Sequence, residues 1–391
     1  MTKLLPFLLL PLLAACGTRP TTQADLNLAK QPKLGNILPL LVDRQATPET
    51  AALFYSLKKI AQDHILFGHQ ASTTQGYGWW YEPNRSDIKE VTGRYPEVYG
   101  WDFIDIASFK PADVVEKAER TTRENAIAAY ERGGINTFSW HYSNPVTEGS
   151  FYWEKSPTQA VSAILPGGSA HEKYKNSLKE IAAFNKTLVS NGMAIPIIFR
   201  PFHEFDGEWF WWGKPHSTAQ EYKDLYRFTV TYLRDSLNVR NFLYAWSPDC
   251  RFKTETEYLE RYPGDAYVDL VGTDDYFDLY EGKDPAVAAS KFKIVSDFAK
   301  AHHKVGALTE TGLKNVAQAD WFTQMLLKAL QQQKIELAYV LLWANRKDEY
   351  WTPYKGHPAE QDFIQFTENP YILMENDVQN IYTLDKTKLK K

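Results

Sequence analysis

Short apolar runs, rich in β-branched and aromatic residues, alternate with longer segments of helical periodicity along most of the chain. Runs of this length and composition are typical of strands that are buried on both faces of a parallel sheet. We expect eight strands, and they lie at 65–70, 95–103, 134–141, 194–204, 241–249, 267–276, 304–311 and 337–346.

Four of the segments between these runs repeat apolar residues with the period of an amphipathic helix, at 47–64, 217–235, 283–302 and 319–333. Two of them begin with a capping residue followed by proline, at Thr47-Pro48 and Asp284-Pro285. A third begins with a predicted capping box from Ser217 to Gln220. Strands that alternate with helices predict a parallel sheet covered by helices.

Eight strand and helix units within residues 41–391 fit a single domain of the α/β class, a (β/α)8 TIM barrel. No repeat, low-complexity block or Pro/Gly-rich linker divides residues 36–391. An open doubly wound sheet is the alternative, but no glycine-rich phosphate turn follows the first predicted strand.

The predicted strands are apolar where they begin and polar or aromatic where they end. In a TIM barrel the carboxyl ends of the strands meet on the face that carries the active site. We therefore expect the strand-end residues to form one site, and they are Gly68 to Gln70, Trp101-Asp102, Trp140-His141, His203-Glu204, Trp246 to Asp249, Asp274 to Tyr276, Glu310, and Trp343 to Arg346.

Two of these strand ends carry glutamates, Glu204 and Glu310, among tryptophans and tyrosines. Glycoside hydrolysis needs one protonated carboxyl group to donate to the leaving oxygen and one ionised carboxylate to attack or to activate water. Aromatic side chains stack on sugar rings and, by excluding water, raise the pKa of a nearby carboxyl group. The structural alternative for Glu204 is an ion pair with Arg200.

Aromatic residues are unusually frequent in the chain, and its net charge is small. The chain has 12 Trp, 23 Tyr and 21 Phe, and its net charge of −4 gives no reason to expect a nucleic-acid partner. No HExxH motif or Cys/His cluster is present, so we expect no catalytic metal and no cofactor. Cys250 has no histidine near it in sequence and is expected to be a spectator, and we expect a monomer.

The first residues have the pattern of an export signal. The apolar run Leu4–Leu13 is too short to span a bilayer, and "LAAC" at its end resembles a bacterial lipoprotein signal. We expect a signal peptide at 1–15, lipidation of Cys16, a polar linker at 16–40, and an exported protein held at a bacterial membrane by its lipid. A plain secretory peptide is the alternative.

Seven motifs, in order along the chain, are similar to those of bacterial β-mannanases of glycoside hydrolase family 26. They are ILFGHQ, YGWD, GGINTFSWH, FRPFHEFDGEWFWWG, GTDDY, LTETG and LLW, and the resemblance covers about residues 45 to 370. It implies a (β/α)8 barrel and a retaining mechanism, with Glu204 as acid/base and Glu310 as nucleophile. It also implies that Tyr276 orients the nucleophile, and that His203 binds the nucleophile or a sugar hydroxyl.

The resemblance further implies that the sugar subsites are lined by Asp274, His141, Trp209 and Trp343. The chain departs from the family pattern near Arg346, because in the family a substrate-binding arginine follows the tryptophan directly, whereas Ala344 and Asn345 intervene here. We expect Trp209 to stack on a sugar, Trp211 and Trp212 to pack within their loop, and Asp206 and Glu208 to cap the loop or lie at its rim. His69 is equally compatible with a structural role and with substrate contact.

The predicted function is retaining hydrolysis of β-1,4-mannan, with mannan, galactomannan or manno-oligosaccharides as substrates. Either internal cleavage or release of mannobiose from a chain end fits the sequence. The alternatives are a β-1,3-xylanase or a mixed-linkage β-glucanase of the same family and, from another class, a glycan-binding lipoprotein without activity. The glycan-binding lipoprotein is less favoured because a binding protein needs neither Glu204 nor Glu310.

Overall fold

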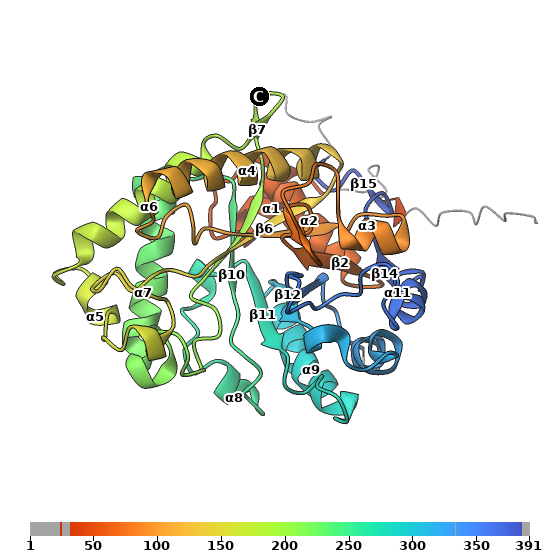
Figure 1. The fold of residues 1–391 in the computed structure, drawn as a ribbon. Coiled ribbons are helices and arrows are strands. Elements are labelled where there is room, and N and C mark those ends of the chain that lie inside the picture. Colours follow the sequence, from red (N-terminus) through yellow and green to blue (C-terminus); the bar gives the residue numbers. More distant parts are fainter. Residues whose placement is uncertain (1–23, 26–31, 333, 385–391) are drawn as a thin grey trace, which may run out of the picture.

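The chain folds into a closed barrel of parallel strands surrounded by helices (Figure 1). The computed structural model describes residues 24–25, 32–332 and 334–384. Within these residues, β13 pairs with β2 and closes a ring of eight strands. The predicted fold and all eight predicted strands are confirmed, as β2 (Ile65–Gln70), β5 (Val98–Asp102), β6 (Ile135–Trp140), β9 (Ile197–Pro201), β10 (Phe242–Trp246), β11 (Leu270–Asp275), β12 (Val305–Thr311) and β13 (Tyr339–Leu342).

Helices follow or precede these strands and cover the outside of the barrel (Figure 1). Their bounds are α1 (Leu34–Ile37), α2 (Pro48–Ile60), α3 (Asp87–Thr92), α4 (Ala112–Glu131), α5 (Val161–Ile164), α6 (His171–Asn185), α7 (Ala219–Thr231), α8 (Glu255–Tyr258), α9 (Pro285–Ala301), α10 (Lys328–Gln331) and α11 (Glu360–Thr367). Short strands outside the ring are β1 (Ala24–Asp25), β3 (Gln75–Gly76), β4 (Trp79–Trp80), β7 (Val189–Ser190), β8 (Met193–Ala194), β14 (Ile372–Leu373) and β15 (Val378–Gln379).

The start of α7 corrects one prediction. A capping box is present, but it joins Thr218 to Glu221, one residue later than the predicted pair of Ser217 and Gln220. The hydroxyl of Ser217 instead accepts a hydrogen bond of 3.0 Å from the guanidinium group of Arg261, which fixes the loop before the helix.

Alternate side chains of each strand belong to two different apolar clusters. Ile198, Leu243 and Leu270 point into the barrel and pack with the apolar face of α2, which covers the end of the barrel where the strands begin. Their neighbours in sequence, such as Ile197 and Val271, pack outward against the helices. This alternation follows from the two-residue period of a strand. It leaves the other end of the barrel, where the strands end, for polar residues.

The N-terminal boundary of the domain differs from the prediction. Residues 34–40 fall within the predicted linker 16–40, yet they form α1 and a short 3-10 helix, and Ile37 is buried in the cluster beneath the barrel. The packed domain therefore begins before residue 41. The predicted signal peptide and Cys16 lie outside the described residues. Among the helices that are described, none has both the length and the apolar character needed to cross a membrane.

Candidate active site

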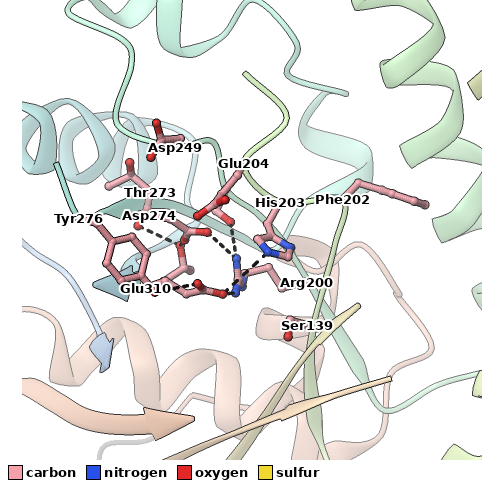
Figure 2. Close-up of polar contacts among 12 residues, drawn as sticks. Ser139, Arg200, Phe202, His203, Glu204, Asp249, Thr273, Asp274, Tyr276 and Glu310 are labelled. Atoms are coloured by element: carbon pink, nitrogen blue, oxygen red, sulfur yellow. Dashed lines mark hydrogen bonds and ion pairs between the residues drawn. The ribbon is translucent and has the colours of Figure 1, made fainter. Parts of the chain in front are cut away.

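Glu204 is presented to the site by an unusual backbone conformation directly after β9. Phe202 and Glu204 both have positive φ angles, 51° and 52°, which non-glycine residues rarely adopt. Figure 2 shows the Phe202 side chain directed away from the site, whereas His203 and Glu204 face Glu310 and Arg200. Phe202 packs on Trp211 and Trp212 instead. Strain of this kind is typical of functional sites, where the surrounding packing maintains it.

A bulge in β12 aims Glu310 at the same site. The register between β11 and β12 shifts after Thr273, so that Thr273 pairs with Leu308 and Asp274 pairs with Glu310. The additional residue, Thr309, is buried and its hydroxyl lies 2.5 Å from Asp274 Oδ1. Bulges commonly redirect side chains beside active sites.

Three side chains surround the Glu310 carboxylate (Figure 2). The Arg200 guanidinium donates to Oε1, and the Tyr276 hydroxyl donates to Oε2 at 3.1 Å. Nε2 of His203 lies 4.0 Å from Oε1, which is close but longer than a hydrogen bond. These contacts hold both oxygens of the Glu310 carboxyl group in place, as the positioning of a nucleophile requires.

Arg200 was missed as a partner of Glu310 in the sequence analysis. It lies two residues after Ile198 on the face of β9 that points into the barrel, and it also donates to Asp274 Oδ2 at 2.8 Å. Burial acts against its charge, but the charges of Asp274 and Glu310 prevail and raise the pKa of Arg200. The expected alternative, a pair between Arg200 and Glu204, does not form; the ion pairs of Arg200 are with Asp274 and Glu310.

Asp274 is paired with Arg200 inside the barrel. Asp274 is 0% exposed, and its carboxyl group accepts hydrogen bonds from Arg200 and Thr309 below the opening of the site. Its place in a sugar subsite, which the resemblance implied, stays a prediction. Its contacts hold the guanidinium group of Arg200 against Glu310.

The environment of Glu204 favours its protonated form. Burial raises the pKa of Glu204 well above its usual value, and the negative charges of Asp274 and Glu310 act in the same direction. One contact opposes them, since the Trp209 indole N–H donates to Oε2 at 2.6 Å and favours the ionised form. A carboxyl group that keeps its proton near neutral pH can act as a general acid.

His141 is held by Asp102, a strand-end residue that was expected at the site but was given no role from the sequence. Nδ1 of His141 lies 2.5 Å from Asp102 Oδ2, and its backbone N–H donates to Oδ1 at 3.1 Å. Burial acts to raise the pKa of Asp102, but the charge and hydrogen bonds of His141 outweigh it, so the pKa is lowered. The His141 ring contacts the rings of His203 and Trp343, with centroids 4.6 and 5.7 Å apart.

Two hollows flank this cluster. One, of about 790 Å³, has Glu204, Trp209 and Tyr276 in its wall. The other, of about 440 Å³, contains His141 and Trp343. The predicted residues Trp209 and Tyr276 thus line one hollow and His141 and Trp343 line the other, and their roles in sugar binding remain predictions.

Other predicted residues have structural positions. Trp211 and Trp212 are fully buried, and their indole groups donate to the carbonyl groups of Tyr142 and His203, which confirms their packing role. Asp206 accepts a hydrogen bond of 2.7 Å from the backbone of Asp249 and so caps its loop. His69 and Cys250 are both buried, and His69 lies outside the walls of the two hollows.

Two groups of side chains within the described residues have the composition of metal ligands, but each already contains a cation of the protein. His203, Asp274 and Glu310 lie close together, and Arg200 bridges the two carboxylates. Cys250, Asp275 and Asp278 form the second group, in which the Lys291 ammonium pairs with Asp278. A metal ion would have to displace these cations, so we assign it no role.

A sequence model of glycosyl hydrolase family 26 matches residues 42–364. The chain belongs to this family. A mannan endo-1,4-beta-mannosidase of Bifidobacterium adolescentis is 37% identical over 357 residues, which are 85% of this chain. The chain spans only 35% of the length of that relative. A mannan endo-1,4-beta-mannosidase of Bacillus subtilis is 28% identical, with 76% of this chain and 78% of the relative covered.

Solved structures of family 26 have the same fold. A family 26 protein from a Muricauda species has a TM-score of 0.86 and 40% identity, with 90% of this chain and 98% of that chain covered. A family 26 β-mannanase from Bacteroides ovatus has a TM-score of 0.80 and 37% identity, with 87% and 98% covered. The family 26 membership and the barrel are therefore established by sequence and by structure.

Proposed function

We propose that this protein is a retaining glycoside hydrolase that cleaves β-1,4-mannan. The observation that carries the proposal is the contrast between two carboxyl groups at the ends of β9 and β12. Burial and nearby negative charges raise the pKa of Glu204 well above its usual value, whereas Glu310 is paired with Arg200 and accepts a hydrogen bond from Tyr276. The similarity to two mannan endo-1,4-beta-mannosidases and to a family 26 β-mannanase supports mannan as the substrate.

The reaction proceeds in two steps. A Glu310 oxygen attacks the anomeric carbon as Glu204 gives its proton to the glycosidic oxygen, so one carbon–oxygen bond forms while the other breaks. The Glu204 carboxylate then takes a proton from water, which attacks the same carbon and releases Glu310 as a carboxylate. Two inversions give net retention, and retaining enzymes place their carboxyl groups about 5–5.5 Å apart.

Arg200, Asp274 and Tyr276 hold the nucleophile in place throughout both steps. The positive charge of Arg200 remains next to Glu310 while the carboxylate is consumed and regenerated, and Asp274 balances that charge in the ester intermediate. Trp209 favours the ionised form of Glu204, and this form is the base of the second step. The same hydrogen bond therefore opposes the first step and assists the second.

The position of the two hollows favours internal cleavage of a chain. The wall of the larger hollow contains Glu204, which protonates the leaving group, so this hollow binds the leaving part of the chain, or aglycone. The smaller hollow contains His141 and Trp343 and binds the part that is transferred to Glu310, or glycone. Hollows on both sides of the catalytic cluster can accommodate polysaccharide on both sides of the scissile bond.

A product time course tests the substrate and the catalytic pair together. Purified protein is incubated with unsubstituted mannan, galactomannan, β-1,3-xylan and mixed-linkage β-glucan, beside Glu204→Gln and Glu310→Gln variants. We expect mannan cleavage to mixed oligosaccharides, loss of activity in both variants, and a β-configured product in the first NMR spectra. Activity on xylan or glucan alone would replace the substrate, and hydrolysis of none of the four would favour a glycan-binding protein.

The proposal includes an exported, monomeric protein that is anchored to a bacterial membrane through lipid on Cys16. The sequence "LAAC" and the polar residues after Cys16 support it. Expression of the full chain and of Cys16→Ser in a bacterium, followed by detergent phase partitioning, tests the anchor. If the anchor is present, the full chain enters the detergent phase and the variant stays in the aqueous phase, and equal partitioning contradicts it.

The monomer is tested by light scattering, and a mass that differs from that of one chain contradicts it.

A further inference from the structure

The glycone hollow extends beyond the residues that surround the reaction. At one end it contains His141, whose ring contacts His203 of the catalytic cluster. Its wall also includes Trp80, from the β3–β4 hairpin after β2, and Arg346, from the loop after β13. Neither of these two residues contributes to the catalytic cluster, and the mechanism leaves both without a role.

In the β3–β4 hairpin, Trp79 is buried and the next residue, Trp80, is exposed. Trp79 is 2% exposed, and its indole N–H donates to Asp87 Oδ1 at 2.7 Å. A Cβ atom on Gly76 would lie 2.1 Å from the Trp79 ring, so only glycine permits this packing. Because successive side chains of a strand point to opposite faces, the anchored Trp79 forces Trp80 outward, where it is 52% exposed. An exposed indole on a pinned hairpin has little conformational entropy to lose on binding.

Asn345 ties the second loop to this hairpin. It is fully buried, and its amide group donates to Asp87 Oδ2 at 2.8 Å, the carboxylate that also holds Trp79. Its side-chain oxygen accepts hydrogen bonds from the backbone N–H groups of Trp351 and Thr352. Its backbone carbonyl group accepts one from the side chain of Gln75. The two loops are therefore fixed relative to each other through the Asn345–Asp87 contact.

Arg346 directly follows Asn345 and is exposed, with its guanidinium group over the Trp80 ring. Its guanidinium carbon lies 6.0 Å from the centre of the Trp80 ring, and its backbone N–H closes a turn with Glu349 at 2.7 Å. A flat aromatic surface with hydrogen-bond donors beside it matches a pyranose ring, whose C–H faces are apolar and whose edge carries hydroxyl groups. The two residues between Trp343 and Arg346, Ala344 and Asn345, thus place the arginine next to the hairpin.

We propose that Trp80 and Arg346 form a distal glycone subsite that binds a hexopyranosyl unit of the chain beyond the units bound at His141 and Trp343. This inference rests on the proposed function, because it assigns the hollow to the glycone. The subsite stacks the sugar ring on Trp80, and Arg346 donates to its hydroxyl groups. It makes the enzyme favour long chains over short oligosaccharides.

Kinetics on substrates of two lengths test the subsite. Trp80→Ala and Arg346→Ala are compared with Tyr280→Ala, a control that removes another exposed aromatic residue outside the walls of both hollows. We expect Trp80→Ala to lower kcat/KM about tenfold more on mannohexaose than on mannotriose, chiefly through KM, corresponding to about 1.4 kcal/mol. Arg346→Ala changes the ratio in the same direction, and Tyr280→Ala leaves it unchanged. Equal losses on both substrates, or no loss, would overturn the subsite.

Binding to an inactive protein separates this inference from the proposed function. Calorimetric titration of Glu204→Gln with mannotriose and mannohexaose, with and without Trp80→Ala, should show that affinity gained from the longer chain disappears with Trp80. The titration is repeated with xylo- and gluco-oligosaccharides of the same lengths. A gain that depends on Trp80 with one of these sugars alone would refute mannan as substrate but retain the subsite. A gain that survives Trp80→Ala would refute the subsite itself.

Discussion

The pKa of Glu204 is subject to opposing influences from its neighbours. Burial and the charges of Asp274 and Glu310 raise its pKa, and the indole N–H of Trp209 acts to lower it. The loop that carries Trp209 is therefore part of the acid–base chemistry as well as of the predicted sugar contact. The basic limb of the pH profile reports the deprotonation of this general acid.

Trp209→Phe removes that hydrogen bond and keeps an aromatic ring. Loss of a donor that favours the ionised form raises the pKa of Glu204, so the basic limb of kcat/KM should move to higher pH. The measurement is the pH profile on a soluble manno-oligosaccharide. Trp321→Phe is the control, since its indole donates to the Leu279 carbonyl group and not to a carboxylate. A limb that moves to lower pH would contradict the assignment.

Tyr276→Phe tests how the nucleophile is positioned. The hydroxyl of Tyr276 donates to Glu310 Oε2 at 3.1 Å, and its loss frees the carboxylate to rotate. We expect kcat to fall on the order of 10- to 100-fold because misplacement of a reacting group has effects of this size. Tyr226→Phe is a matched control, because that buried hydroxyl binds the Ala245 carbonyl group on β10. If both variants lost kcat equally, the effect would be structural.

Between elements, hydrogen bonds of Asn345 join the loops after β2 and β13. Asn345→Asp keeps the shape of the linking residue but places its carboxylate against that of Asp87, 2.8 Å from the atom replaced. The new carboxyl group is harder to ionise in the fold than in the unfolded chain, so stability is lost as pH rises.

We therefore expect Asn345→Asp to lower the free energy of unfolding by about 3 kcal/mol at neutral pH and by less at pH 4. Chemical denaturation at the two pH values measures the difference. Asn125→Asp on α4 makes the same change where the amide donates to the Thr121 carbonyl group, and its cost should not show this pH dependence. An equal deficit at both pH values would mean that no carboxylate repulsion is present.

For the molecule as a whole, the active site works against stability. The pKa of Glu204 in the fold is raised above the value of about 4.5 expected in the unfolded chain. Below about pH 4.5 both states are protonated, and as pH rises toward the folded pKa the unfolded state ionises first and is favoured. Glu204 thus lowers the stability of the barrel progressively as pH rises from about 4.5 toward its folded pKa.

Glu204→Gln cannot ionise and should escape this loss. We expect the variant to be inactive yet to have a higher Tm than the parent at pH 8, with little difference at pH 4, as is typical when a strained or charged active-site residue is neutralised. Calorimetry at both pH values checks it. A variant that is stabilised only at pH 4, or destabilised at pH 8, would show that Glu204 is not held in its protonated form.

The sequence determined the barrel because its signals are local. Apolar runs of strand length, helical periodicity between them, and polar strand ends recur along the chain, and each depends on neighbouring residues alone. Position at the strand ends was sufficient to bring Glu204, Glu310, His203 and Tyr276 together, since parallel strands in a barrel end on one face. The packing of Trp211 and Trp212 within the loop that follows Glu204 was also predicted from the sequence.

The tertiary structure decided which residues are partners. Arg200 pairs with Glu310 and Asp274 across the inside of the barrel, over sequence separations that periodicity does not register, and a single bulge at Thr309 sets the direction of Glu310. Asp274 appeared in sequence as one more polar residue at a strand end, and only its burial shows that it supports Arg200. The Asn345–Asp87 link joins residues 258 apart. Contacts of this kind depend on side-chain direction and closed geometry, and these exist only once the barrel has formed.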